Sequence, residues 1–180
     1  KKIADTETPQ GIIAVCEMRS KRLDDFLASG KMLLVLDRVT DPGNIGTMLR
    51  TADAAGVGGL LLLQGCADIY APKTVRASMG SLFHLPVLSG LSEELLVQAA
   101  RKAGYELLVT CLDGADNLYK ADLQGRLAFV MGNEANGVSP ALLAAADKRV
   151  FIPMQGRAES LNVAMAAGIV MFEALRQKLK

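Results

Sequence analysis

The chain has 180 residues, of which 51% are hydrophobic, and its formal net charge is +1 at pH 7. This length fits one domain with a core, and the balanced charge excludes a large basic field, although a local patch would suffice for RNA. Three widely spaced cysteines without a CxxC pair, and a single histidine, predict a reduced cytoplasmic protein without a metal site. No apolar run reaches the roughly 20 residues that span a membrane.

Strands and helices alternate along the chain. An N-terminal piece is expected to form a strand at 11–18 and a short helix at 23–30. Apolar runs and helical spacing then predict, in chain order, strand 32–39, helix 45–56, strand 59–64, helix 72–80, strand 85–88, helix 91–104, strand 105–112, polar loop 113–125, strand 126–132, helix 140–146 and strand 148–154.

The last predicted helix is the most informative element. Ser160 is expected to cap it, because a serine hydroxyl accepts from the free amides of a first turn. Residues 161–172 are almost wholly apolar, which is typical of a helix buried on every side. Such a helix belongs in a core or in a subunit interface.

The alternation of buried strands and helices predicts an α/β fold: a mostly parallel sheet with helices on both faces. Ligands of such sheets bind beyond the carboxyl ends of the strands. Three loops rich in glycine and amide side chains, at 41–46, 132–139 and 155–160, follow strands and are expected at that edge. Their convergence predicts a site there.

The first loop suits a phosphate. A helix N-terminus, with Asn44 and Gly46 in its turn, would precede Arg50, which the helix carries inward. A tight turn followed by a surface arginine is the plainer alternative. The segment is not a dinucleotide fingerprint, because it lacks G-x-G-x-x-G.

The other two loops leave similar alternatives open. Glu134 could pair with an arginine or cap a helix, and its loop could equally be a simple polar turn. Ser160 and Asn162 could hydrogen-bond a substrate, or Ser160 could only cap the helix. Three further cations near the same edge could form a phosphate-binding patch for RNA, or be ordinary surface residues: Lys73, Arg76 and Arg157.

In this order, the three loops resemble the motifs of the SpoU (TrmH-like) family of RNA 2′-O-ribose methyltransferases, within the SPOUT superfamily. The similarity covers roughly residues 30–176, and residues 70–87 also resemble the family. The matching positions are Asn44, Gly46, Arg50 and Thr51 in the first motif, Gly132, Glu134, Gly137 and Ser139 in the second, and Pro153, Gly156, Ser160, Leu161, Asn162 and Val163 in the third.

The resemblance implies a C-terminal trefoil knot, although general topology rules argue against knots. It also implies S-adenosylmethionine as the methyl donor, held largely by backbone groups of the knot. Carried over by position, these groups lie near Thr110, Gly132, Ile152, Met154 and Leu161.

The implied reaction is attack of a ribose 2′ oxygen on the sulfonium methyl, so the protein must position the hydroxyl and assist its loss of a proton. The family gives the central role to the equivalent of Arg50. Because a guanidinium stays protonated in proteins and is a poor base, we expect Arg50 to hold the adjacent phosphate and stabilise alkoxide charge. Asn44, Ser160 and Asn162 would orient the ribose and the arginine, and Glu134 would fix the arginine or the dimer.

Family members are usually homodimers with the last helix in the interface, and many carry an N-terminal RNA-binding domain. We expect residues 1–29 to be an extension packed on a catalytic domain of residues 30–180. The missing initial methionine raises the expectation that an RNA-binding domain precedes residue 1.

Two other functions compete with this one. A nucleotide-using enzyme of doubly wound fold is disfavoured by the missing dinucleotide fingerprint. A non-catalytic RNA-binding or scaffold protein would not need the complete set of Arg50, Glu134 and Asn162. The sequence does not choose between ribosomal and transfer RNA as substrate.

Overall fold

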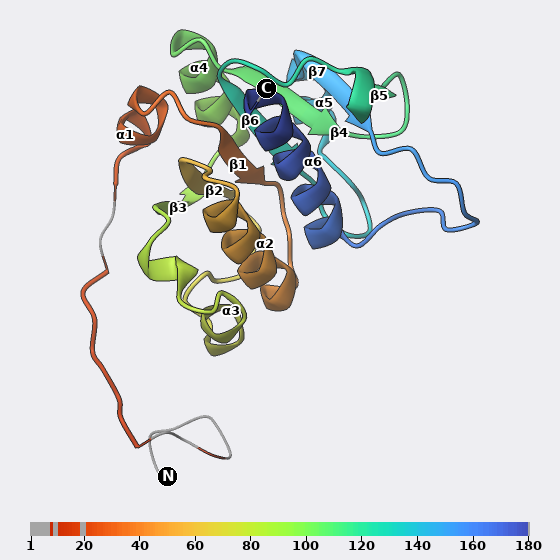
Figure 1. The fold of residues 1–180 in the computed structure, drawn as a ribbon. Coiled ribbons are helices and arrows are strands. Elements are labelled where there is room, and N and C mark those ends of the chain that lie inside the picture. Colours follow the sequence, from red (N-terminus) through yellow and green to blue (C-terminus); the bar gives the residue numbers. More distant parts are fainter. Residues whose placement is uncertain (1–7, 9–10, 19–20, 180) are drawn as a thin grey trace.

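The computed structural model describes residue 8, residues 11–18 and residues 21–179. Within these residues, seven strands form one sheet in the order β3-β2-β1-β6-β4-β7-β5, and every paired neighbour is parallel (Figure 1). The strands are β1 Leu33–Leu36, β2 Gly59–Leu63, β3 Val87–Leu91, β4 Glu106–Thr110, β5 Asp116–Asn117, β6 Leu127–Met131 and β7 Lys148–Phe151. The predicted parallel sheet is therefore confirmed.

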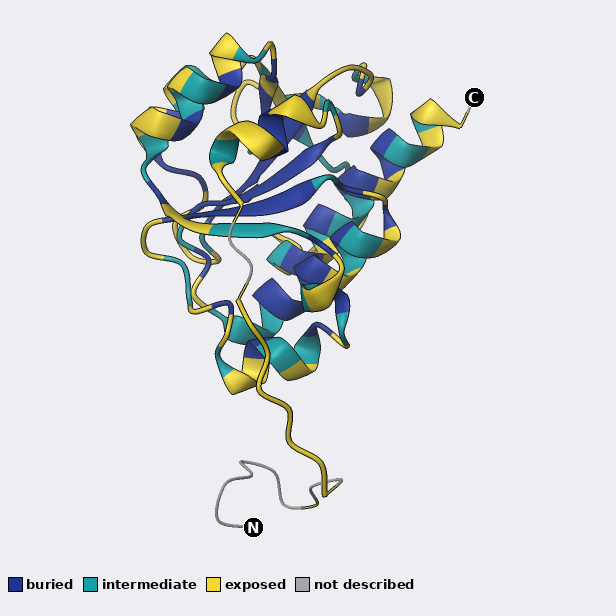
Figure 2. Ribbon diagram, turned by 90° about the vertical axis from the view of Figure 1, so that its left-hand side faces the viewer, coloured by how far each residue is buried: buried dark blue, intermediate teal, exposed yellow. Residues whose placement is uncertain are grey.

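Helices cover both faces of the sheet, as predicted, and Figure 2 shows the buried strands between the two helical layers. They are α1 Leu23–Ala28, α2 Pro42–Ala54, α3 Pro72–Ala77, α4 Glu93–Lys102, α5 Pro140–Ala145 and α6 Val163–Lys178, with short 3-10 turns η1 Ser81–Phe83 and η2 Leu118–Lys120. Alternate residues of β1 enter opposite cores: Leu34 and Leu36 pack with α2 and α6, whereas Leu33 and Val35 pack with α1 and α4.

Several predicted elements differ from the structure, and one is β3 Val87–Leu91, which begins two residues after the predicted strand 85–88 begins and ends three residues after it ends. The strand expected at 11–18 is wrong, since these residues form no strand and Ile12, Ile13 and Val15 are exposed. The helix expected at 45–56 begins at Pro42, because Asp41 caps it and proline is well suited to a first helical turn. The polar loop 113–125 contains β5, which pairs with β7 at the edge of the sheet.

Two expectations about the last helix are corrected. Its N-cap is Asn162, whose side chain accepts from the amides of Ala164 and Met165, so Ser160 is not the cap. The helix is not buried on every side of this single chain either. Met165 is 61% exposed and Phe172 is 47% exposed, which leaves an apolar strip of α6 uncovered.

Gly46 allows α2 to lie against α3. A Cβ at this position would stand 2.5 Å from the Cβ of Ala77 and 2.7 Å from the carbonyl oxygen of Thr74. The absence of a side chain at Gly46 therefore permits a close approach of helix to helix. Across the described residues, no helix is long and apolar enough to cross a membrane.

Candidate active site

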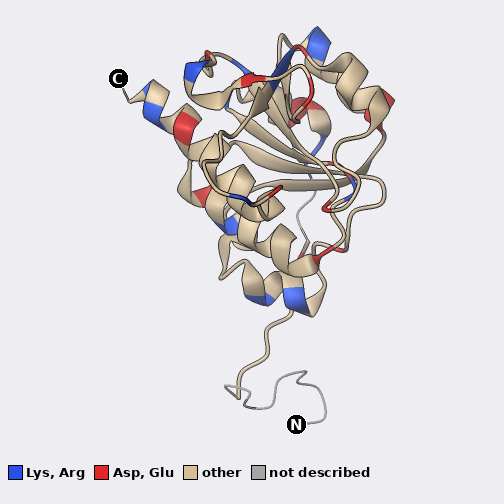
Figure 3. Ribbon diagram, turned by 90° about the vertical axis from the view of Figure 1, so that its right-hand side faces the viewer, with Lys and Arg blue, Asp and Glu red and all other residues tan. Residues whose placement is uncertain are grey.

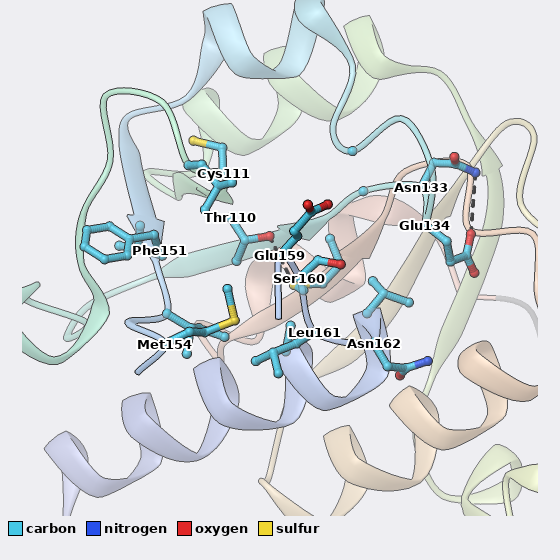
Figure 4. A pocket seen from close by; sticks show the side chains of 18 residues that line it. Thr110, Cys111, Asn133, Glu134, Phe151, Met154, Glu159, Ser160, Leu161 and Asn162 are labelled. Carbon is cyan, nitrogen blue, oxygen red and sulfur yellow. Dashed lines mark hydrogen bonds between the residues drawn. The ribbon is translucent and has the colours of Figure 1, made fainter. Parts of the chain in front are cut away.

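A cavity of about 430 Å³ lies beyond the carboxyl ends of β4, β6 and β7, and residues from two of the three predicted loops, 132–139 and 155–160, line it (Figure 4). Its volume is within the range of small-molecule pockets. The five residues predicted to hold a cofactor all line it: Thr110, Gly132, Ile152, Met154 and Leu161. Their common position agrees with a cofactor site, and the binding role itself stays a prediction.

A chain of side-chain hydrogen bonds joins the three motif loops. The Asn44 amide donates to Oε1 of Glu134 at 3.0 Å, and Oδ1 of Asn44 accepts from the Asn162 amide at 3.0 Å. Asn162 in turn caps α6. This Glu134–Asn44–Asn162 chain links residues about 90 and 118 positions apart in sequence, so one carboxylate fixes the start of α2 and, through Asn44, the start of α6.

The Glu134 carboxylate is held by several donors from one segment. Besides Asn44, the backbone amides of Thr40 and Asp41 donate to it at 3.4 and 3.3 Å. Partial burial opposes its ionisation, but these hydrogen bonds outweigh burial and hold the pKa of Glu134 below its usual value. Of the alternatives left open for Glu134, pairing with an arginine is not found among the described residues, because its hydrogen bonds go to the 40–44 segment and to Asn133.

The start of α2 is not an open phosphate seat, contrary to expectation. The Asp41 side chain accepts from the amides of Gly43 and Asn44, and Lys73 lies 3.4 Å from the same carboxylate. The Gly43 amide, with help from Asn44 and Lys73 against a smaller effect of burial, lowers the pKa of Asp41. Two carboxylates, Asp41 and Glu134, thus occupy the amides that would have met a phosphate.

Sequence reasoning missed Asp37, which anchors the Glu134 loop. Asp37 is fully buried, accepts from the buried amide of Ser139 at 2.7 Å and pairs with Arg38 at 2.9 Å. Gly132 closes the loop from the other end, since a Cβ there would stand 2.2 Å from the carbonyl carbon of Gly137. The available signal was an acidic residue directly after a continuous apolar strand.

Arg50 lies outside the cavity lining and is exposed on α2, so the expectation that the helix carries it inward is wrong. Within the described part of the chain, its guanidinium has no hydrogen bond or ion pair. Arg76 and Arg157 are exposed as well. Figure 3 shows Lys and Arg spread over many elements rather than gathered on one face.

Ser160 lies at the cavity with a free hydroxyl. It lines the pocket beside Leu161 and Asn162, and no hydrogen bond of its hydroxyl is found among the described residues. Asn44 and Asn162 differ from it, because their amides are already engaged with each other and with Glu134. Of the polar residues predicted to orient a ribose, Ser160 is therefore the one with unused hydrogen-bonding capacity.

The family model of the SpoU rRNA methylases matches residues 31–172. The chain belongs to this family. Among solved structures, an AdoMet-bound rRNA methyltransferase from Sinorhizobium meliloti superimposes with a TM-score of 0.83 at 38% identity, covering 91% of this chain and 63% of that one. The AviRb methyltransferase of Streptomyces viridochromogenes with AdoMet gives 0.82 at 39% identity, covering 91% of this chain and 67% of that one.

The curated relatives of this chain are longer than the chain itself. A 23S rRNA guanosine 2′-O-methyltransferase of Bacillus subtilis is 40% identical over 170 residues, which cover 94% of this chain and 66% of the relative. A 23S rRNA uridine 2′-O-methyltransferase of Streptomyces viridochromogenes is 41% identical, and the match covers 96% of this chain and 62% of the relative. The chain thus spans just under two thirds of these proteins.

Glu134→Gln should remove an acid-sensitive part of the stability. A carboxylate whose folded pKa is lowered stabilises the fold above its unfolded pKa of about 4.3, and this contribution is lost as pH falls through the folded pKa. Urea unfolding at neutral pH should find the variant less stable than the wild type. The difference in free energy of unfolding between wild type and variant should narrow below about pH 4.

Asp113→Asn is the control, since it removes an exposed carboxylate outside this hydrogen-bond chain. It should leave the difference from wild type nearly constant with pH. A Glu134→Gln deficit that is equally large at neutral and at acidic pH would contradict the assignment.

Proposed function

We propose that this chain transfers a methyl group from S-adenosylmethionine to a ribose 2′-hydroxyl of ribosomal RNA. The observation that carries the proposal is the cavity at the carboxyl ends of β4, β6 and β7, bordered by the Glu134–Asn44–Asn162 chain of the three family motifs. Relatives at 34–41% identity named for 23S rRNA methylation favour ribosomal over transfer RNA.

The residues at the cavity fit S-adenosylmethionine. Apolar side chains such as Ile152, Met154 and Leu161 can cover an adenosine, and Gly132 keeps the backbone accessible. The charged residues among the lining are Glu134 and Glu159, which suits a cation better than a phosphate. This charge disfavours the competing nucleotide-using enzyme. When bound, S-adenosylmethionine supplies an electrophilic methyl group on a positively charged sulfur.

The residues of the chain divide the remaining work. Ser160 orients the ribose, because its hydroxyl is free and lies at the cavity. Asn44 and Asn162 act mainly by fixing α2 and α6, since their amides hold one another. Arg50 supplies a guanidinium, without a hydrogen bond or ion pair among the described residues, that can hold a phosphate of the substrate and stabilise charge on the 2′ oxygen. The hydroxyl proton leaves to solvent, because a guanidinium is a poor base.

RNA binding rests on side chains rather than on a helix N-terminus. Lys73 and Arg76 belong to α3, which lies against α2, and Arg157 belongs to the loop before α6. Because the start of α2 carries two carboxylates, these cations and Arg50 are the groups that could meet RNA phosphates. We expect the resulting affinity to fall as salt rises.

We also propose a cytoplasmic homodimer that meets through α6, and a trefoil knot in the C-terminal segment. The dimer is supported by the uncovered strip of Leu161, Met165 and Phe172. The knot is supported by the path of the chain after β7: residues 150–152, 154 and 159–163 line the cavity together with 110–112, 131–134 and 137, before α6 packs on α2. Residues 30–180 would form the catalytic domain, with residues 1–29 as its extension.

Arg50→Ala should abolish methyl transfer while leaving S-adenosylmethionine affinity nearly unchanged. Arg50 lies outside the cavity lining, so its loss removes a charge at the reacting oxygen and not a cofactor contact. Loss of one such preorganised contact typically costs about 10²–10³ in rate. Arg50→Lys should rescue poorly, because lysine lacks the planar fork. The measurements are single-turnover transfer to ribosomal RNA and calorimetry with S-adenosylmethionine.

Near-normal turnover of Arg50→Ala on saturating RNA would refute this role. So would a loss of cofactor affinity in step with activity. If the wild-type chain bound no S-adenosylmethionine at all, the proposed function itself would be wrong.

Met165→Glu should convert a wild-type dimer into a monomer, because it places a charge in the proposed α6 interface. Leu95→Glu is the matched control: Leu95 is 50% exposed on α4, on the other layer of the sheet. Ile169 is a poorer probe, since it is half-buried against the core. Light scattering at micromolar concentration compares the molecular masses of the two variants with that of the wild type. A monomeric wild type would contradict the proposed dimer.

A further inference from the structure

The charge at the cavity comes from two glutamates. Glu134 and Glu159 line the cavity, and its described lining contains no lysine or arginine. Arg157 is two residues from Glu159, but it is exposed outside the lining. A ligand in this cavity therefore meets negative charge from the protein.

The two glutamates differ in what they already contact. Glu134 accepts hydrogen bonds from Thr40, Asp41 and Asn44, so its charge is largely compensated by the protein. Glu159 has no hydrogen bond or ion pair among the described residues. In Figure 4 its side chain projects into the cavity, between Thr110 and Asn133 in this view. Glu159 is thus the uncompensated charge of the cavity.

We propose that Glu159 determines specificity for the positively charged sulfur of the methyl donor and thereby favours replacement of the spent product by fresh donor. This inference rests on the proposed function. Transfer breaks the sulfur–methyl bond, leaves its electron pair on sulfur and forms a bond from the methyl carbon to the ribose 2′ oxygen, whose proton goes to solvent. The sulfur loses its charge, whereas the ammonium and carboxylate of the ligand do not change.

The effect of Glu159 should be moderate. Its carboxylate is exposed, and ion pairs in such positions are weakened by solvent and by salt. We expect Glu159 to favour S-adenosylmethionine over S-adenosylhomocysteine by about two- to fivefold at low salt. A preference of this size would help the methylated donor to replace the spent product between turnovers.

Calorimetry of wild type and Glu159→Gln with three ligands tests the proposal. S-adenosylmethionine carries the charged sulfur, S-adenosylhomocysteine carries a neutral one, and sinefungin carries an amine-bearing carbon in place of the methyl-bearing sulfur. Glu159→Gln should weaken binding of the first and third ligands about two- to fivefold and leave S-adenosylhomocysteine nearly unchanged. Raising the salt concentration should reduce the wild-type preference and have little effect on the variant.

Glu94→Gln is the control, because Glu94 is exposed on α4, away from the cavity. It should leave all three affinities as in the wild type. An equal loss for the three ligands in Glu159→Gln would place Glu159 at their shared ammonium group and overturn the proposal. An unchanged affinity for all three would overturn it as well. If no ligand bound the wild-type chain, the proposed function would fail instead.

Discussion

The site depends on the hydrogen bonds of the Glu134 carboxylate. This carboxylate closes the gap between the loop after β6 and the loop after β1, through the amides of Thr40 and Asp41 and the side chain of Asn44. Asn44 then holds Asn162, the cap of α6. Apart from the Glu134–Asn44–Asn162 hydrogen bonds, no polar contact among the described residues joins the start of α2 to the start of α6.

This arrangement changes what the helix ends can do. Helix N-termini attract anions, and the start of α2 looks suited to a phosphate in the sequence. In the structure, Asp41 and Glu134 supply the anions, and Lys73 pairs with Asp41. The dipole of α2 therefore stabilises the site internally. In the proposed function, exposed cations such as Arg50 would contact RNA, and the cavity with Glu159 would select the cofactor.

Much of the fold could be predicted because its signals are local. Continuous apolar strands such as Leu33–Leu36 are typical of a parallel sheet with both faces covered, and Ser92 caps α4 as its sequence position predicts. The carboxyl ends of parallel strands lie at one edge of the sheet, and this determines which loops meet. The clustering of Gly132, Leu161 and Asn162 could therefore be predicted from the order of the elements.

What could not be predicted depends on contacts between distant residues. Ser160 and Asn162 are both good capping residues, and the structure gives the role to Asn162, whose side chain also donates to Asn44. The direction of Arg50 depends on how α3 and α6 flank α2, and the partner of Ser139 is a buried aspartate 102 residues away. The 11–18 segment has the apolar pattern of a strand but pairs with no strand among the described residues.

A double-mutant cycle between Glu134→Gln and Asn162→Ala, measured as free energies of unfolding, tests the hydrogen-bond chain most directly. Glu134 and Asn162 have no hydrogen bond with each other. Without a link through Asn44, the effects of the two substitutions on the free energy of unfolding should therefore be additive. The chain through Asn44 predicts a coupling of about 0.5 kcal/mol or more, which disappears when the cycle is repeated in an Asn44→Ala background. Additivity within about 0.3 kcal/mol in the wild-type background would contradict it.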